Sequence, residues 1–317
     1  MGEAQLPWNA GTHDGLVSIG SHELHLYASG PTRQTLNGTY QPAVIIEAGL
    51  GSSQSEWVAV QRLIASKARV YTYDRAGYGR SQASPLPPTA QNRVHELTHL
   101  LDAAAIEAPY ILVGHSYGGV LIREFLRQHP GKVAGMVIVD SSRVRTRLPT
   151  SWPNLMGPSS YPAIVGLDTN HILTPEEYEA VERDQSRNMA TAQVEEGFIA
   201  SSTEAVNAAL PLGYRALGHK PLSVIFANES VDFGKIYDFS VTHGYGSIAE
   251  REEMRERLTD MEQVDEQGQR AHLGMSSRSR FVYAQDNART HNVQIVAPEM
   301  IRDEVFWALG IAEESEE

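Results

Sequence analysis

A serine and a histidine stand side by side between two glycines in the segment Gly114-His115-Ser116-Tyr117-Gly118. The apolar run YILVG ends at the first glycine, and VLIREFLRQH, which has a helical pattern, follows the second. In this context a G-x-S-x-G sequence is typical of a sharp turn from a strand into a helix, which holds the serine hydroxyl above the sheet. We therefore predict that Ser116 is a catalytic nucleophile; the alternative is a tight turn in which small residues only save space.

A serine hydroxyl needs a neighbouring base to accept its proton. His115 is adjacent, but successive side chains at such a turn point in different directions, so we expect it to pack beside the site. His291 lies in THNVQIVAPEMI, after the run RFVYA and seven residues before Pro298, which opens a predicted helix. That place is at the carboxyl edge of the predicted sheet, where ligands bind in open α/β folds. We predict that His291 is the general base.

The elements that would position these residues alternate along the chain. A hairpin is predicted in GLVSIGSHELHLYASG, and the later strands are separated by helical patterns, which implies right-handed crossovers and a mostly parallel sheet flanked by helices. The alternation breaks after Asp140, where a proline-rich loop precedes a helical pattern from Thr174 to Ala209. We predict a core domain of residues 1–140 and 220–317 with an inserted helical lid of residues 141–219. The predicted later strands are PAVIIEAG, RVYTYDR, YILVG, VAGMVIVD, PLSVIFAN and RFVYA.

Four motifs in this order resemble those of the α/β-hydrolase superfamily. VGHSYGG resembles its nucleophile elbow, YDRAGYGRS the loop after its fourth strand, THNVQIVAPEMI its histidine loop and closing helix, and EAGLGSSQSEW its oxyanion loop. The oxyanion-loop motif departs from the family pattern, since a His-Gly pair is commoner where this chain has Ala48-Gly49. The resemblance covers nearly all of residues 16–310 except the lid. It implies an α/β-hydrolase fold with a serine hydrolase or esterase-like activity.

The resemblance also implies further site residues. The main-chain amides of Leu50 and Tyr117 would form the oxyanion hole. The acid that orients the histidine follows one of two strands in the family: Asp140 ends VAGMVIVD, whereas Glu229 and Asp232 follow PLSVIFAN. We favour Asp140 because it ends a strand directly and stands 24 residues after Ser116, a spacing that resembles members using that place.

These residues predict a serine hydrolase that cleaves a carboxylic ester, lactone or thioester through an acyl-enzyme on Ser116, with a small-molecule acyl substrate and no organic cofactor or metal. A serine in the nucleophile position argues against epoxide hydrolases and haloalkane dehalogenases, which need a carboxylate there. The alternative from another class is a noncatalytic receptor or scaffold that retains the fold and the pocket.

Composition excludes several other classes. The 317 residues carry 26 Lys and Arg against 39 Asp and Glu, a formal charge of −13 that argues against nucleic-acid binding. No apolar run approaches the roughly 18 residues of a membrane span. The N-terminus shows no secretory signal and the chain has no cysteine, so we expect a cytoplasmic protein without disulfides.

The segment HELTH, residues 95–99, matches the H-E-x-x-H zinc motif. We expect the match to be accidental, because Val94, Leu97 and Leu101 cluster on the opposite side of the predicted helix and leave His95 and His99 in solvent. Asp74 in YDRAGYGRS is expected to hold its loop through hydrogen bonds to turn amides.

Overall fold

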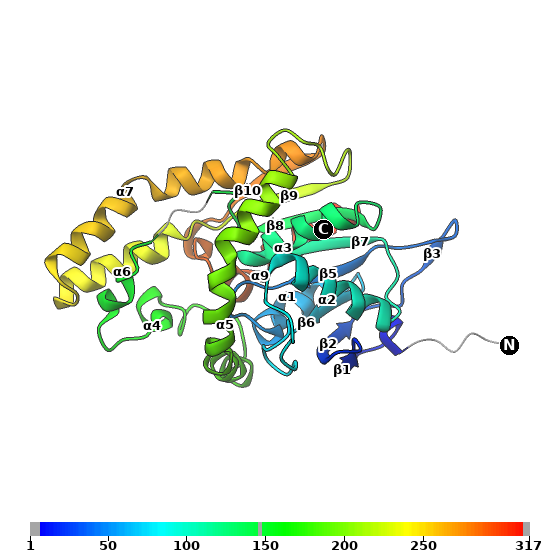
Figure 1. Ribbon diagram of the computed structural model, residues 1–317, viewed down its shortest axis with the longest axis horizontal. Helices are drawn as coiled ribbons and strands as arrows, with labels where there is room; N and C mark the ends of the chain where they lie inside the picture. Colours follow the sequence, from blue (N-terminus) through cyan, green and yellow to red (C-terminus); the bar gives the residue numbers. More distant parts are fainter. Residues whose placement is uncertain (1–6, 145–147, 313–317) are drawn as a thin grey trace, which may run out of the picture.

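An eight-stranded sheet forms the centre of the computed structural model, which describes residues 7–144 and 148–312 (Figure 1). The strand order is β1-β2-β6-β5-β7-β8-β9-β10. β1 and β2 form an antiparallel hairpin, β2 is antiparallel to β6, and all later neighbours are parallel. The strands are β1 (His13–Ser18), β2 (Glu23–Ser29), β5 (Ala43–Glu47), β6 (Val70–Tyr73), β7 (Tyr110–His115), β8 (Val133–Val139), β9 (Leu222–Phe226) and β10 (Ser279–Tyr283); β3 (Thr35–Leu36) and β4 (Thr39–Tyr40) form a separate pair.

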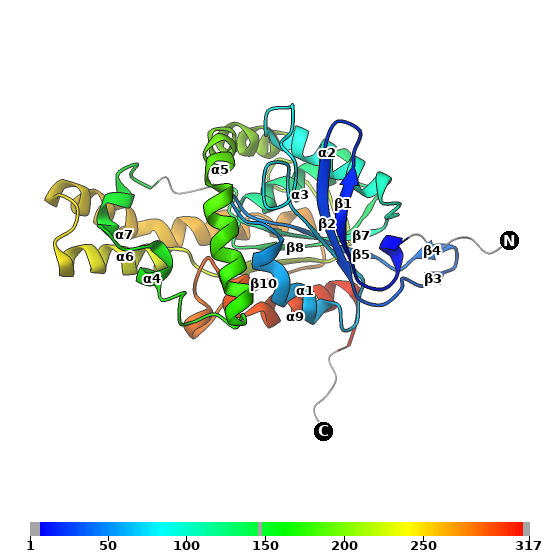
Figure 2. The ribbon, with the colours of Figure 1, turned by 90° about the horizontal axis from the view of Figure 1, so that it is seen from below.

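Helices cover both faces of this sheet (Figure 2). Helix α2 (Ala90–Ala103) and helix α3 (Tyr117–Gln128) pack on one face, and α1 (Val58–Ile64) and α9 (Pro298–Leu309) on the other. The central strands β5 and β7 are buried at every residue, as expected for a parallel sheet covered on both sides. The result is an α/β-hydrolase fold, as the sequence predicts.

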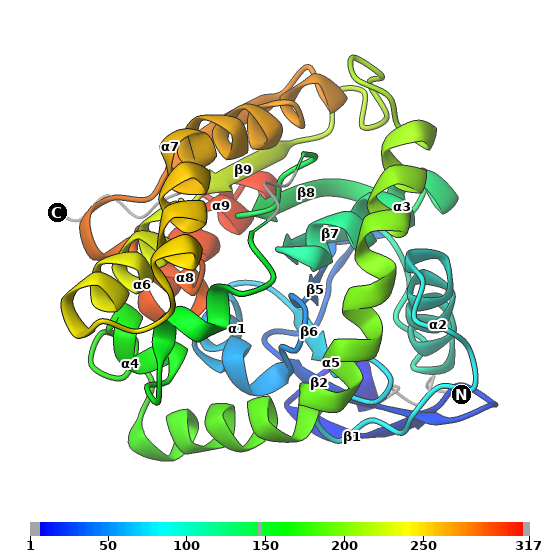
Figure 3. The same cartoon turned by 60° about the vertical axis from the view of Figure 1, so that its left-hand side comes forward.

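The long insertion between β8 and β9 is helical. It contains η3 (Trp152–Met156), α4 (Tyr161–Val165) and the 35-residue α5 (Pro175–Ala209). Thr174 begins α5 with a complete capping box, and Pro175 occupies the first turn, where its missing N–H costs nothing. Figure 3 shows α5 as a long, bent helix that passes close to α3.

A second helical excursion lies between β9 and β10. Helix α6 (Ser230–His243) and helix α7 (Ile248–Arg270) run side by side and project with α4 at one end of the molecule (Figure 1). Their apolar residues share a cluster with Leu155, Val165 and Val181, which come from the segment predicted as the lid. The helical layer is therefore built from two separate parts of the chain.

The predicted elements agree with the structure within a few residues. Asp232, the other candidate acid, lies in the first turn of α6. Short elements such as α4 and α8 (Val293–Val296) were not predicted. Both are too short for a periodic pattern to identify.

Candidate active site

Ser116 occupies the turn between β7 and α3. Its φ of 52° and ψ of −121° are strained for a residue with a Cβ atom. Hydrogen bonds hold the turn on both sides, since the Ser116 N–H donates to Val139 O at 3.0 Å and the Gly119 N–H donates to Ser116 O at 3.0 Å. The strand, the turn and the helix predicted around this serine are all present, and its side chain is half-buried.

The glycines beside the turn allow β7, α3 and β5 to approach closely. A Cβ atom on Gly118 would lie 2.1 Å from the carbonyl oxygen of Glu47, and one on Gly114 would lie 2.6 Å from that of Gly118. Both obstacles are main-chain atoms, which cannot rotate away. The glycines therefore make room for backbone packing beneath Ser116.

This packing predicts opposite effects for two glycine substitutions. Gly118→Ala should destabilise the protein by about 3 kcal/mol or more, because the new methyl group overlaps the backbone of β5. Gly197→Ala is the control: Gly197 lies inside α5 with no atom within 4 Å of the added Cβ. This change should raise the free energy of unfolding by about 0.5–1 kcal/mol, measured by chemical denaturation. Equal stability of the Gly118→Ala variant and the wild type would contradict the prediction.

The structure brings Ser116, Asp140 and His291 to the same edge of the sheet. His115 pairs with Val139 in the β7–β8 register, so Ser116 and Asp140 are the next residues on adjacent strands. The Nδ1 atom of His291 lies 2.8 Å from Oδ2 of Asp140. The oxyanion loop reaches the same place, because a Cβ atom on Gly49 would lie 3.3 Å from that of Ser116.

Asp140 is held in a defined orientation. Its φ is +44°, and its other oxygen, Oδ1, accepts hydrogen bonds from Ala227 N at 3.0 Å, Asn228 N at 3.1 Å and Gln269 Nε2 at 2.9 Å. Burial alone would raise the pKa of Asp140, but the hydrogen bond and the charge of His291 outweigh it and lower that pKa. An ionised carboxylate therefore faces the imidazole.

Asp232, the alternative acid, contacts the main chain of His291 and not its ring. Its Oδ2 accepts hydrogen bonds from His291 N at 2.9 Å, Thr290 Oγ1 at 2.8 Å and Tyr161 Oη at 3.1 Å. Burial raises the pKa of Asp232. Its position is that of a residue that holds the histidine loop.

His115 packs beneath the same loop, as expected. Its Nε2 lies 2.8 Å from the carbonyl oxygen of His291, and the two ring centroids are 4.5 Å apart. A carbonyl can only accept, so this nitrogen carries the proton. His115 is therefore placed to support the main chain of His291.

The surroundings of two main-chain amides, those of Leu50 and Tyr117, bear on the expected oxyanion hole. The Tyr117 N–H is the first of α3 and has no partner within the helix. Arg75 donates to Gly49 O at 2.6 Å. In a trans peptide the C=O and the following N–H point in opposite directions, so this bond turns the Leu50 N–H away from Arg75.

The same arginine connects the oxyanion loop to α5. Arg75 also contacts Glu195 Oε2 at 2.9 Å and Ala48 O at 2.6 Å. Glu195 is wholly buried and accepts further hydrogen bonds from Arg93 at 2.7 Å and Tyr78 at 2.7 Å. Sequence analysis missed Arg75, Glu195 and Gln269, since no local motif marks a polar residue whose partners are distant in sequence.

Replacing Glu195 with glutamine should therefore cost about 3–5 kcal/mol of stability at neutral pH, because two buried arginines lose their shared countercharge. Burial would raise the pKa of Glu195, but the charges of Arg75 and Arg93 lower it below the ordinary 4.5. The stabilisation is therefore full above about pH 4.5 and is lost as the pH falls through the lower, folded pKa.

Chemical denaturation should be carried out at several pH values from neutral to acidic. The difference in free energy of unfolding between the wild type and Glu195→Gln should shrink only at acidic pH. The matched control is Glu196→Gln, its exposed neighbour on α5, which should leave the profile of the wild type unchanged. If the stability difference between the wild type and Glu195→Gln stays constant down to the lowest pH at which the protein folds, this role for Glu195 is contradicted.

Two other sequence predictions concern residues outside this site. Asp74 accepts hydrogen bonds from Gln54 N at 2.8 Å and Arg80 N at 3.0 Å, which confirms its role in the loop.

In the segment HELTH, His95 and His99 are exposed, whereas Glu96 is buried and pairs with Arg93 at 3.1 Å. Within residues 7–144 and 148–312, no three His, Cys, Asp or Glu side chains are grouped to hold a metal ion.

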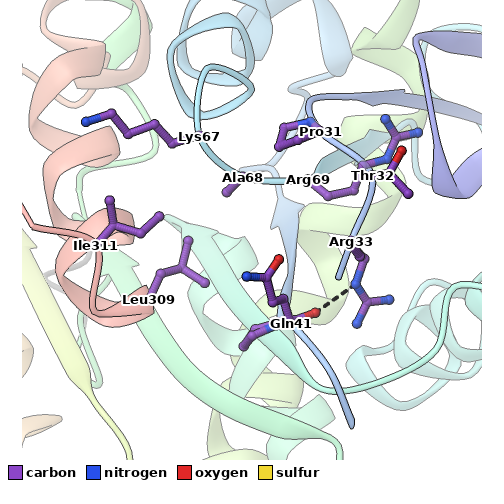
Figure 4. Close-up of a pocket in the computed structure, with 10 residues that line it drawn as sticks. Pro31, Thr32, Arg33, Gln41, Lys67, Ala68, Arg69, Leu309 and Ile311 are labelled. Atoms are coloured by element: carbon purple, nitrogen blue, oxygen red, sulfur yellow. Dashed lines mark hydrogen bonds between the residues drawn. The ribbon is translucent and has the colours of Figure 1, made fainter. Parts of the chain in front are cut away.

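A surface hollow lies at the other edge of the sheet, next to the residues that precede β5 and β6 (Figure 4). Arg33 lines it and donates to Gln41 O at 2.8 Å and to Glu107 O at 2.7 Å. Because parallel strands have their carboxyl ends at the opposite edge, this hollow is remote from Ser116.

Fold and site define an α/β hydrolase, and comparison with known proteins agrees. The chain belongs to the α/β-hydrolase family, whose model matches residues 44–282. An "AB hydrolase superfamily protein" of Gibberella zeae is 33% identical over 304 residues, which cover 89% of this chain and 90% of that protein. The "Probable transporter efuK" of Hormonema carpetanum is 31% identical over 315 residues, which cover 96% of this chain but 44% of that protein.

Among solved structures, a serine hydrolase involved in carbazole degradation (CarC enzyme) matches with a TM-score of 0.60 and 14% identity over 95% of this chain and all of that one. At that identity the likeness shows the fold alone. No helix in the described part of the chain is both long and apolar enough to cross a membrane.

Proposed function

We propose that the protein is a serine hydrolase that cleaves a carboxylic ester, lactone or thioester of a small organic substrate. The observation that carries the proposal is the contact between Asp140 Oδ2 and His291 Nδ1 at 2.8 Å, next to a serine in a strained turn. In the proposal these residues fill the three roles of a catalytic triad: Ser116 is the nucleophile, His291 the base, and Asp140 the carboxylate that orients the base.

In the proposed reaction, Nε2 of His291 takes the proton of the Ser116 hydroxyl as Oγ attacks the acyl carbon. Asp140 accepts the Nδ1–H of His291 and stabilises the imidazolium that forms. The negative charge on the former carbonyl oxygen is stabilised by the N–H groups of Leu50 and Tyr117.

His291 then gives its proton to the departing oxygen or sulfur, which leaves an ester on Ser116. Water attacks this acyl-enzyme, His291 accepts a proton from the water, and Ser116 is released with its proton restored. No metal or organic cofactor takes part in these steps.

Covalent labelling tests the proposal against a noncatalytic receptor. A fluorophosphonate reacts with a serine only when a base activates it, so the folded protein should take up one label per chain, located on the peptide that contains Ser116. Heat-denatured protein is the control and should take up none. Absence of labelling in the folded protein would favour the receptor.

A panel of p-nitrophenyl esters of increasing chain length, thioesters and lactones would then identify the substrate class. Turnover of one class well above the others, in the same preparation that takes up the label, is the expected result. Labelling without turnover of any member would contradict the proposed substrate classes.

A further inference from the structure

Two buried arginines lie near the carboxyl end of β8 without a carboxylate beside them. Arg123 is on α3 and is 0% exposed, and Arg143 follows β8 and is 5% exposed. In the described part of the chain neither forms an ion pair with an acidic residue. Glu124, next to Arg123 in sequence, binds Arg127 with both carboxylate oxygens at 2.7 Å. The two charges are therefore buried without compensation from a neighbouring side chain.

Neutral groups bind part of each guanidinium. Arg123 donates to Asn207 Oδ1 at 2.6 Å and to Gly119 O at 3.3 Å, and Arg143 Nη2 donates to Leu210 O. Asn207 links the two arginines, because its Nδ2 donates to Arg143 O at 2.8 Å. One nitrogen of each guanidinium, Nη2 of Arg123 and Nη1 of Arg143, is buried with no partner. Each arginine thus has a donor group available for a ligand.

The charges of the two groups act on each other. Burial and the charge of Arg143 lower the pKa of Arg123 to about 9, and burial lowers that of Arg143. Burial and both arginines lower the pKa of His272 well below 6.5, so this ring is neutral. Its Nε2 donates to Ser141 O at 2.9 Å, which leaves Nδ1 as an acceptor that cannot bind an anion.

We propose that Arg123 and Arg143 together bind one small inorganic anion of the size of chloride. A water molecule could accept the two free N–H groups but would leave two positive charges uncompensated in a medium of low dielectric constant, which is costly. Because Arg123 is 0% exposed and Arg143 5% exposed, we choose a monatomic anion, about the size of a water molecule, which needs less room than a phosphate or a substrate carboxylate.

The proposed anion would connect three parts of the fold. Arg123 belongs to the helix that begins at the Ser116 turn, Arg143 follows Asp140 by three residues, and Asn207 and Leu210 lie at the end of α5. An anion between the arginines would hold the end of the inserted helix on the core. The proposal does not depend on the proposed hydrolase activity.

Thermal unfolding in chloride and gluconate at one fixed ionic strength tests the anion site, since gluconate is too large to enter. At chloride concentrations above the dissociation constant of the site, each tenfold rise in chloride concentration should lower the apparent equilibrium constant of unfolding of the wild type about tenfold. Arg123→Met and Arg143→Met should each abolish this dependence. Arg127→Met, which removes an arginine of the same helix at the surface, should retain it.

Crystals soaked in bromide provide a second measurement that needs no variant. An anomalous peak between the guanidiniums of Arg123 and Arg143 is expected. Equal melting temperatures of the wild type in chloride and gluconate, a chloride dependence that survives in both methionine variants, or bromide-soaked crystals with only water at this place would each overturn the proposal.

Discussion

Replacing Ser116 with alanine should lower kcat for an activated ester such as p-nitrophenyl acetate about a millionfold. The alanine side chain has no oxygen to form the acyl-enzyme, and water alone would have to attack the substrate. The free energy of unfolding should change little or rise, because the strained turn is held by main-chain hydrogen bonds that the substitution keeps. Fluorophosphonate labelling should disappear with the turnover.

Ser201→Ala is the matched control for this experiment. Ser201 is an exposed residue of α5 whose hydroxyl donates to Phe198 O at 3.1 Å. Its replacement should leave labelling and turnover at the level of the wild type. Ester hydrolysis that persists in folded Ser116→Ala within about tenfold of the wild type would show that another group is the nucleophile.

Replacing Asp140 with asparagine should lower kcat about ten-thousandfold without unfolding the protein. Three N–H donors, from Ala227, Asn228 and Gln269, surround Oδ1 and would select the amide oxygen of the asparagine for that place. The amide NH₂ would then face Nδ1 of His291, which must become an acceptor. The ring proton moves to Nε2, and that nitrogen can no longer accept the proton of Ser116.

Asp232→Asn is the informative comparison, because the asparagine oxygen can still accept from His291 N, Thr290 and Tyr161. We expect kcat to stay within about tenfold of the wild type. Circular dichroism and melting temperature should establish that both variants are folded before their rates are compared. Loss of turnover in folded Asp232→Asn alone would show that Asp232, and not Asp140, orients the histidine.

The local sequence was enough to predict most of the scaffold. Buried strands such as β5 and β7 are short, β-branched runs, and α5 begins at a capping box with Pro175 in its first turn, so each pattern is contained in a few consecutive residues. The turn at Ser116 was predictable for the same reason, because the strand, the glycines and the helix that strain it are adjacent in the chain.

The choice between Asp140 and Asp232 depended on the tertiary structure. Both follow strands that end at the same edge, and the sequence does not say which carboxylate will meet the ring of His291 and which its main chain. The position of each residue relative to the end of its strand determines which carboxylate meets the ring. Asp140 comes directly after β8, whereas Asp232 lies in the first turn of α6. A shift of one helical residue rotates a side chain by about 100°, so such contacts are not readable from the strand pattern.

The sequence by itself determined the order of strands and helices, the strained turn at Ser116 and the edge at which His291 lies, because these features arise from neighbouring residues. Only the tertiary structure joined Glu195 to Arg75 and to the oxyanion loop, and left Arg123 and Arg143 together without a carboxylate. Those contacts join side chains up to 120 residues apart. Their energies depend on burial and on the geometry of the whole fold, which a local pattern does not contain.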